Sequence, residues 1–289
     1  MSRPLKFYIF WNFFSLIPLI LLANQGRSWP FLPNHFPFYI LLVSSVIPLV
    51  VAYLAVNRFY GLKGLQKLKA TVYPTELKGS AMTIASVPVL FLLAGIGFYP
   101  IFFDSFFSLK SFLKEHEIYT YFNVLVWFLP FIPMAISDAV GWRGFALPHF
   151  QAKYTAFGAS VFIGLMNAVY VVLVSSIRQE IDLLFFLRIT ASSIFQSILL
   201  TAAFNYSKGS VFPCLLFNLM YYFVIALDPV FLSLVSMVGY MLLSAYYINR
   251  YGRVHLGEGR RTKNFYKKAL SVKEKKDLLM VEDEDDSDN

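Results

Sequence analysis

The stretch Ser137–Gln151, with the sequence SDAVGWRGFALPHFQ, directly follows a long apolar run and carries two opposite charges, Asp138 and Arg143. Ionised side chains in such a place are costly, by about 2.5–3.5 kcal/mol each at the centre of a bilayer. An ionisable pair retained in an apolar chain therefore marks a candidate functional site.

The composition around this stretch is that of a membrane protein. The chain has 289 residues, of which 57% are hydrophobic and 15% charged, and its mean hydropathy is +0.59. These values predict an all-α polytopic membrane protein. About eight apolar runs approach the ~20 residues that a spanning helix needs. We place them at Phe7–Asn24, Pro37–Val56, Ala81–Phe103, Tyr119–Ile136, Ala156–Ser175, Leu183–Asn205, Val211–Leu227 and Val230–Ile248.

The basic residues predict the orientation of the chain. They concentrate before the first run, in every second connecting segment and after the last run. By the positive-inside rule both termini are cytoplasmic, so the net charge of +8 indicates orientation and contact with lipid headgroups rather than binding to nucleic acid. The basic segment Arg58–Ser80 is either an amphipathic helix on the inner leaflet or a solvated loop.

Two regions follow from this pattern. Residues 1–249 form a transmembrane bundle, and residues 250–289 form a polar cytoplasmic tail that is basic at first and ends in an acidic run. Such charge blocks are typical of disordered segments.

Several kinds of chemistry find no support in the sequence. There is no phosphate-binding or dinucleotide-binding glycine motif and no HExxH zinc helix. One cysteine, Cys214, cannot form an internal disulfide. The four histidines lie in or beside predicted loops, and His149 is expected at the surface. We therefore predict no metal and no cofactor.

Polar residues interrupt the sixth apolar run. Arg188 and Gln196 are eight residues apart and share a helix face, which should point into the bundle and bind neighbouring helices. With Asn205 they could instead line a transport path, a weaker alternative because no paired half-helices accompany them.

Three stretches in the second half of the chain resemble one family. GWRGFALPHFQ at Gly141–Gln151 is similar to the first motif region of the CPBP intramembrane proteases, the CAAX prenyl endopeptidases and their bacteriocin-processing and immunity relatives. ASVFIGLMNAVYVV at Ala159–Val172 and FNYSKGSVFPCLLFNLMYY at Phe204–Tyr222 follow in the order of the second and third motifs. The resemblance covers about residues 119–222 and implies a CAAX-protease-like bundle of eight helices.

The family residues carry over only in part. The resemblance implies a pair of glutamates, of which the first falls on Asp138 and the second on Ala139, while the arginine is retained as Arg143. The first histidine falls on Val171, and Asn167 replaces the aromatic residue one turn earlier. The second histidine and the asparagine fall on Asn218 and Tyr222.

These replacements affect the two halves of the implied mechanism unequally. Asn218 and Tyr222 are four residues apart on one helix face, and both can donate hydrogen bonds to an oxyanion. Water activation would rest on Asp138 alone, and loss of a general base typically costs about 10²–10⁴-fold in rate. We therefore favour a non-catalytic protein that binds a peptide or a membrane-protein partner as scaffold, immunity factor or regulator. The alternative is an active endopeptidase with Asp138 as base and Asn218 with Tyr222 as oxyanion donors.

The relation of Asp138 to Arg143 depends on the helix. Five residues on an ideal α-helix lie about 140° apart, so the two charges share a face only if the helix ends between them, for which Gly141 is the candidate. We expect Arg143 to hold that helix end and the following loop through carbonyls or a carboxylate.

Overall fold

The structure is a computed structural model that describes residues 1–26, 36–73, 79–103, 129, 131–176, 182–226 and 230–256. All regular structure in these ranges is helical, which confirms the all-α class. The elements are α1 (Arg3–Phe14), α2 (Leu16–Gly26), α3 (Phe36–Val72), α4 (Gly79–Phe103), α7 (Phe131–Asp138), the π-helix η1 (Ala139–Ala146), α8 (Leu147–Gln151), α9 (Ala156–Ser175), α10 (Leu183–Tyr206), α11 (Phe212–Ala226) and α12 (Val230–His255).

Five of the described helices are long and apolar enough to cross a membrane, so the chain is a membrane protein. They are Arg3–Asn24, Leu42–Val72, Gly79–Ile101, Ala156–Ser175 and Leu183–Tyr206, and Phe212–Val224 is a shorter apolar helix. Of the predicted run Tyr119–Ile136, the structure describes only residue 129 and the part from Phe131 onward. The predicted number of about eight spans therefore remains a prediction. Of the predicted tail only the segment up to residue 256 lies within the described residues.

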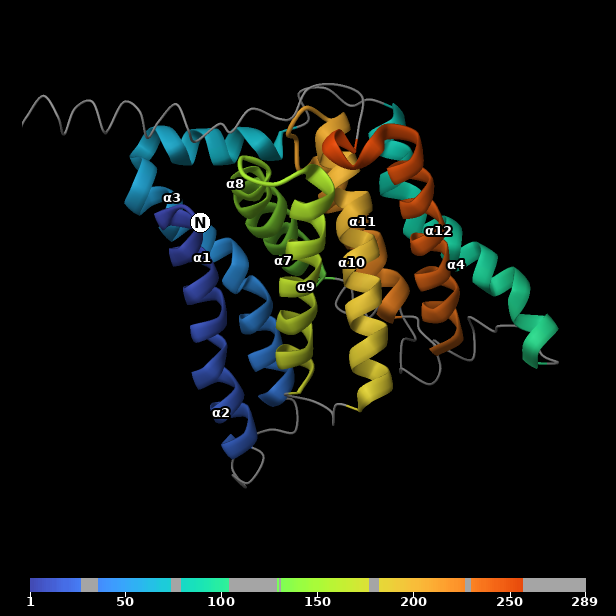
Figure 1. The fold of residues 1–289 in the computed structure, drawn as a ribbon. Helices are drawn as coiled ribbons and strands as arrows, with labels where there is room; N and C mark the ends of the chain where they lie inside the picture. The colour runs from blue at the N-terminus through green and yellow to red at the C-terminus, as the bar shows by residue number, and fades with distance from the viewer. Residues whose placement is uncertain are drawn as a thin grey trace, which may run out of the picture.

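The helices pack side by side with their long axes roughly aligned, and both described ends of the chain lie at the same end of this bundle (Figure 1). The largest interhelical contacts join α9 to α10 and α4 to α11, while α3 packs on α7 and η1. The segment α7–η1–α8 is thus enclosed by α3 on one side and by α9, α10 and α11 on others.

The last part of α3 turns sharply and lies across the end of the bundle, as Figure 1 shows. The turn is at Gly61, whose backbone has φ 60° and ψ −160°. This left-handed region strains residues with a Cβ, so the glycine permits the turn. From the sequence, the basic segment Arg58–Ser80 was either an amphipathic helix or a solvated loop. The structure continues as a helix to Val72, which favours the amphipathic helix.

This transverse helix, residues 62–72, has one buried face and one charged face. Leu65 and Leu68 are buried, whereas Lys63 and Lys69 are exposed. Its last turn is tied to the start of α11, because the Val211 N–H donates to the Thr71 carbonyl at 2.8 Å. The spacing of the buried residues is that of a helix lying on an apolar surface.

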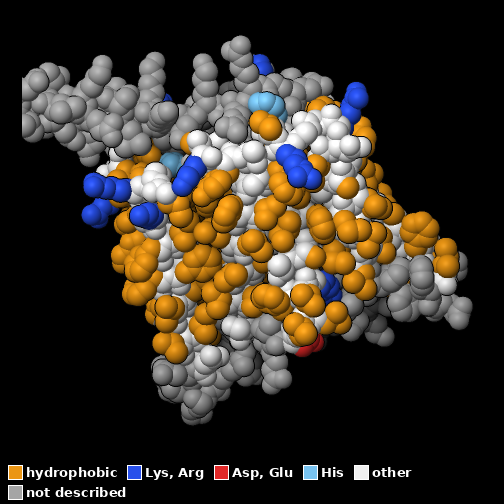
Figure 2. Space-filling model, viewed as in Figure 1, with side chains coloured by type: hydrophobic (Ala, Val, Ile, Leu, Met, Phe, Trp, Pro, Cys, Tyr) orange, Lys and Arg blue, Asp and Glu red, His pale blue; other side chains and the backbone are white. Residues whose placement is uncertain are grey.

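The surface side chains change from basic to hydrophobic along the length of the bundle. Most of the lysines and arginines visible in Figure 2 gather at the end that carries the transverse helix, and hydrophobic side chains cover the face beneath them. Exposed aliphatic side chains in this position are what a lipid-facing surface requires.

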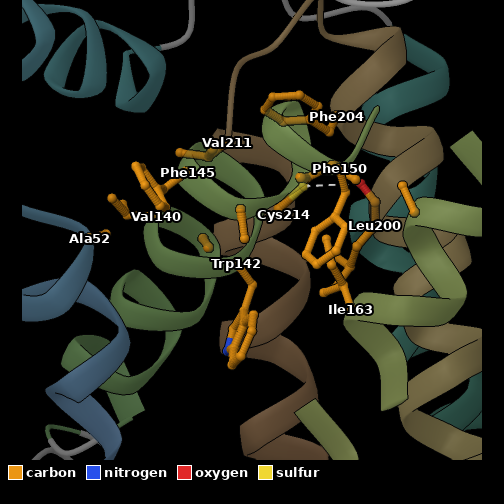
Figure 3. Packing of buried hydrophobic residues seen from close by; sticks show 14 of the residues in the cluster. Ala52, Val140, Trp142, Phe145, Phe150, Ile163, Leu200, Phe204, Val211 and Cys214 are labelled. Atoms are coloured by element: carbon orange, nitrogen blue, oxygen red, sulfur yellow. Dashed lines mark hydrogen bonds between the residues drawn. The ribbon is translucent and has the colours of Figure 1, made fainter. Parts of the chain in front are cut away.

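The core is rich in aromatic side chains and is centred on η1. Trp142, Phe145, Phe204 and Phe217 are almost completely buried in one cluster. Figure 3 shows Cys214 within this cluster, where its thiol donates to the Leu200 carbonyl at 3.3 Å. The single cysteine is therefore a buried packing residue.

Candidate functional site

The site begins where the α-helix that ends at Asp138 continues as a π-helix. In η1 the hydrogen bonds run from residue i to i+5, so residues five apart lie one turn above each other. Asp138 and Arg143 have this spacing. The prediction that the helix ends at Gly141 is wrong, because the helix continues with a wider turn. The two charges act on each other through space but, within the described residues, they form no ion pair.

Close packing against α3 explains why a glycine stands in the middle of η1. A Cβ placed on Gly141 would lie 2.7 Å from the Pro48 Cβ and 2.8 Å from the Pro48 carbonyl carbon. Real Cβ atoms do not come this close, so only glycine allows η1 to pack on the proline of α3. The glycine thus sets the distance between α3 and the segment that carries Asp138.

Pro48 also supplies polar groups to the site. A proline in a helix has no N–H for the carbonyl four residues earlier, which here is Ser44. The Tyr170 hydroxyl of α9 donates to that carbonyl. The Leu49 N–H, one residue after the proline, donates to the Ser137 hydroxyl at 3.1 Å. The turns of α3 on either side of Pro48 are thereby hydrogen-bonded to α9 and to α7, the latter at the residue before Asp138.

Asp138 makes its direct contact with α11. The Tyr222 hydroxyl donates a hydrogen bond to Asp138 Oδ2. The Phe131 ring lies nearly parallel to the Tyr222 ring, with 6.3 Å between centroids. Both Asp138 and Tyr222 are partly exposed. The structure therefore brings together two of the predicted site residues, but it pairs them with each other.

Arg143 points to different helices. Its Nη1 donates to the Ser197 hydroxyl of α10 at 3.0 Å, and Ser197 in turn donates to the Ser160 carbonyl of α9 at 2.6 Å. Arg143 itself is 4% exposed. We expected Arg143 to hold the helix end through carbonyls or a carboxylate. That expectation was wrong, because the observed partner is the Ser197 hydroxyl. Arg143 ties η1 to a pair of close-packed helices.

The remaining predicted residues lie near this pair without joining it. Asn218 is buried one turn before Tyr222. Asn167 and Val171 are partly buried on α9, and Ala139 is completely buried in η1. Neither Val171 nor Ala139 has a side chain that can accept a proton, as their residue types already indicate.

Two further polar groups at the site were not predicted from sequence. The Tyr8 hydroxyl of α1 and the Trp142 Nε1 of η1 are buried and have no hydrogen-bond partner among the described residues. Their rings pack edge to face with 5.5 Å between centroids, and Trp142 packs in the same way on Tyr170 at 6.2 Å. The charge of Asp138 reaches both Tyr8 and Tyr170. Tyr8 and Trp142 thus leave two polar groups without partners, among the described residues, in the packing around η1.

The sequence contained no signal for these donors, since each is an aromatic residue within an apolar run. Tyr8 comes from a helix that lies outside the family-like region. Pro48 was the nearest available signal, because a proline inside a spanning helix releases a carbonyl that another residue must satisfy.

His149 is buried, contrary to its expected place at the surface. It is 7% exposed, and its Nδ1 lies 2.7 Å from the Phe145 carbonyl. A carbonyl can only accept, so Nδ1 carries the proton and Nε2 accepts from the Tyr60 hydroxyl at 2.8 Å. Burial lowers the pKa of His149 from 6.5 to about 4, although the bond to Phe145 opposes this. The imidazole is neutral and joins α8 to α3.

The described residues contain no group of three or more His, Cys, Asp or Glu side chains that could hold a metal ion. A scan against models of known protein families and a search of curated proteins gave no match to this chain. The class that fold and site define is therefore an all-α membrane protein with a partly exposed tyrosine–carboxylate pair between its helices.

Proposed function

We propose that this protein is a degenerate, non-catalytic relative of the CPBP intramembrane proteases that binds a peptide or a membrane-protein partner. The three motif-like stretches support the relationship. The non-catalytic part rests on one observation, the hydrogen bond from Tyr222 to Asp138.

This bond occupies both residues that proteolysis would need. An active endopeptidase would use Asp138 to take a proton from water and Tyr222 to donate to the oxyanion. In the structure the Tyr222 proton is directed at the carboxylate. Val171 and Ala139 contribute no second base. The carboxylate is thus better placed to hold two helices together than to activate water.

The same surroundings favour binding. Asp138 and Tyr222 remain partly exposed, while Tyr8 and Trp142 keep polar atoms unpaired within the described part of the chain. Buried unpaired donors cost about 1–3 kcal/mol each. A peptide main chain offers carbonyls to such donors, so a bound segment would recover part of that cost.

We further propose that the protein is multi-pass with about eight spans and that both termini are cytoplasmic. The basic residues of the first and last segments and the position of both described chain ends at one end of the bundle support this. Labelling of single cysteines placed at Ser2 and at Arg250, in a Cys214→Ala background, tests it. Both sites should react only after the membrane is permeabilised, and reaction of either in intact cells would contradict the topology.

A cleavage assay tests the loss of catalysis. Purified protein in lipid vesicles is incubated with a quenched prenylated CAAX peptide and with a panel of membrane peptides, beside the Asp138→Asn variant. We expect no turnover from either protein. Turnover that disappears in the folded variant would overturn the proposal and make Asp138 a base that works without histidine.

A crosslinking experiment tests binding. A photoreactive residue at Asn218 should give discrete crosslinks to a peptide or protein. One at Leu165, which is 42% exposed on α9, should give crosslinks to lipid only. The Asn218 crosslinks should weaken when Asp138 is replaced by Ala. Equal protein crosslinking from both positions would contradict a specific binding site.

A further inference from the structure

A groove runs along the bundle between α1 and α3, apart from Asp138. Its volume is about 770 Å³. Its lining is aliphatic and aromatic except for Ser15 and Arg58. We propose that this groove binds one anionic phospholipid, with an acyl chain along the apolar lining and the headgroup at Arg58.

The lining does not suit an extended polypeptide. Val43, Val50 and Leu54 project into it with 56%, 49% and 48% of their surface exposed, and all three lie in the candidate span Leu42–Val72. An extended main chain in a membrane, unlike a helix, needs outside partners for its N–H and C=O groups. Besides Arg58, the only polar lining side chain is Ser15. An acyl chain has no hydrogen-bonding groups and therefore needs no polar partners in the groove.

The groove is long enough to take a lipid tail. Its lining extends along α3 from Leu42 to Arg58, a rise of about 24 Å at about 1.5 Å per residue. Half of a bilayer's hydrocarbon core is about 15 Å thick. The groove therefore leads from the level of Arg58 beyond the depth of one leaflet.

Arg58 stands where a headgroup would lie. It is exposed and comes three residues before Gly61, where α3 turns across the end of the bundle. The transverse helix at that end has an apolar inner face and a lysine-bearing outer face, the pattern of a helix in the interface plane. Figure 2 shows lysine and arginine side chains gathered at this level.

The Arg58 cation is held in place and is available. Its guanidinium lies over the Phe7 ring at 5.6 Å and over the Phe59 ring at 5.9 Å. The acids in the described part of the chain are Asp138 and Asp182, and neither forms an ion pair with it. A phosphate can bind the planar guanidinium through two parallel hydrogen bonds, so the charge selects an anionic headgroup.

Native mass spectrometry of the whole protein tests this proposal with phosphatidylglycerol and phosphatidylcholine as probes. We expect one phosphatidylglycerol to be retained in preference to phosphatidylcholine. The preference should fall about fivefold in Arg58→Gln, the effect of one cation near a membrane surface. It should stay unchanged in Arg250→Gln, which removes an exposed arginine outside the groove.

A second pair of variants tests the groove itself. Val50→Trp fills it, whereas Leu90→Trp adds the same bulk at a position on α4 that is 52% exposed and outside it. Only Val50→Trp should remove the retained lipid. Equal retention of both lipids by the wild type, or equal effects of the paired variants, would show bulk lipid contact and overturn the proposal. A dimer lost in Val50→Trp would make a second copy the occupant and would also overturn it.

Discussion

The hydrogen bond between Tyr222 and Asp138 can be measured by a double-mutant cycle. A hydrogen bond to a charged group contributes about 1.5–3 kcal/mol, and a neutral one about 0.5–1.5 kcal/mol. Tyr222→Phe should therefore lower the free energy of unfolding by about 2 kcal/mol in the wild-type background. Asp138→Asn keeps an acceptor oxygen but removes the charge, so the same change should cost only about 1 kcal/mol there. The expected coupling is about 1 kcal/mol.

Reversible unfolding of the purified protein in mixed SDS micelles gives the four free energies. Tyr246→Phe is the control, because Tyr246 is 56% exposed and should change stability by less than about 0.5 kcal/mol. If Tyr222→Phe costs no more than this control, or if the coupling is below about 0.5 kcal/mol, the two side chains do not hold the helices together. The Tyr222–Asp138 hydrogen bond would then no longer support the loss of catalysis.

Three further outcomes follow from the packing. Because the pKa of His149 is lowered from 6.5 to about 4, the unfolded chain takes up a proton first as pH falls. Stability should be complete above pH 6.5 and about 2 kcal/mol lower by pH 5, a loss that His149→Gln abolishes in unfolding titrations. Gly141→Ala places a Cβ at 2.7 Å from Pro48, whereas Gly144→Ala meets nothing closer than 3.4 Å. Only the first should lower the yield of folded protein in size-exclusion chromatography, and equal losses would contradict the close packing. Arg143→Met and Ser197→Ala should each cost about 1.5–3 kcal/mol in the same unfolding assay, and clearly less than the sum when combined.

Sequence reasoning succeeded where the signal was local. Apolar runs predicted helices at α4, α9 and α10 close to their observed bounds, because spanning helices satisfy their own backbone and need no partner to be recognised. It failed at η1, since an α-helical periodicity was assumed for a segment that forms a π-helix. It also failed at His149. The histidine was expected at the surface because it lies in a predicted loop, and nothing in the sequence indicated its partners on α3 and in η1.

The sequence by itself determined that this is an all-helical membrane protein with charges in its second half, because hydropathy and composition depend on each residue alone. It also identified Asp138 and Arg143 as charges in a costly place, whereas Tyr222 was named only through the family resemblance. Only the tertiary structure decided that Asp138 pairs with Tyr222, that Arg143 bonds Ser197, and that Tyr8 packs on Trp142. These contacts join residues of different helices, and their formation depends on how helices cross, which Pro48 and Gly141 set through close contact rather than through periodicity.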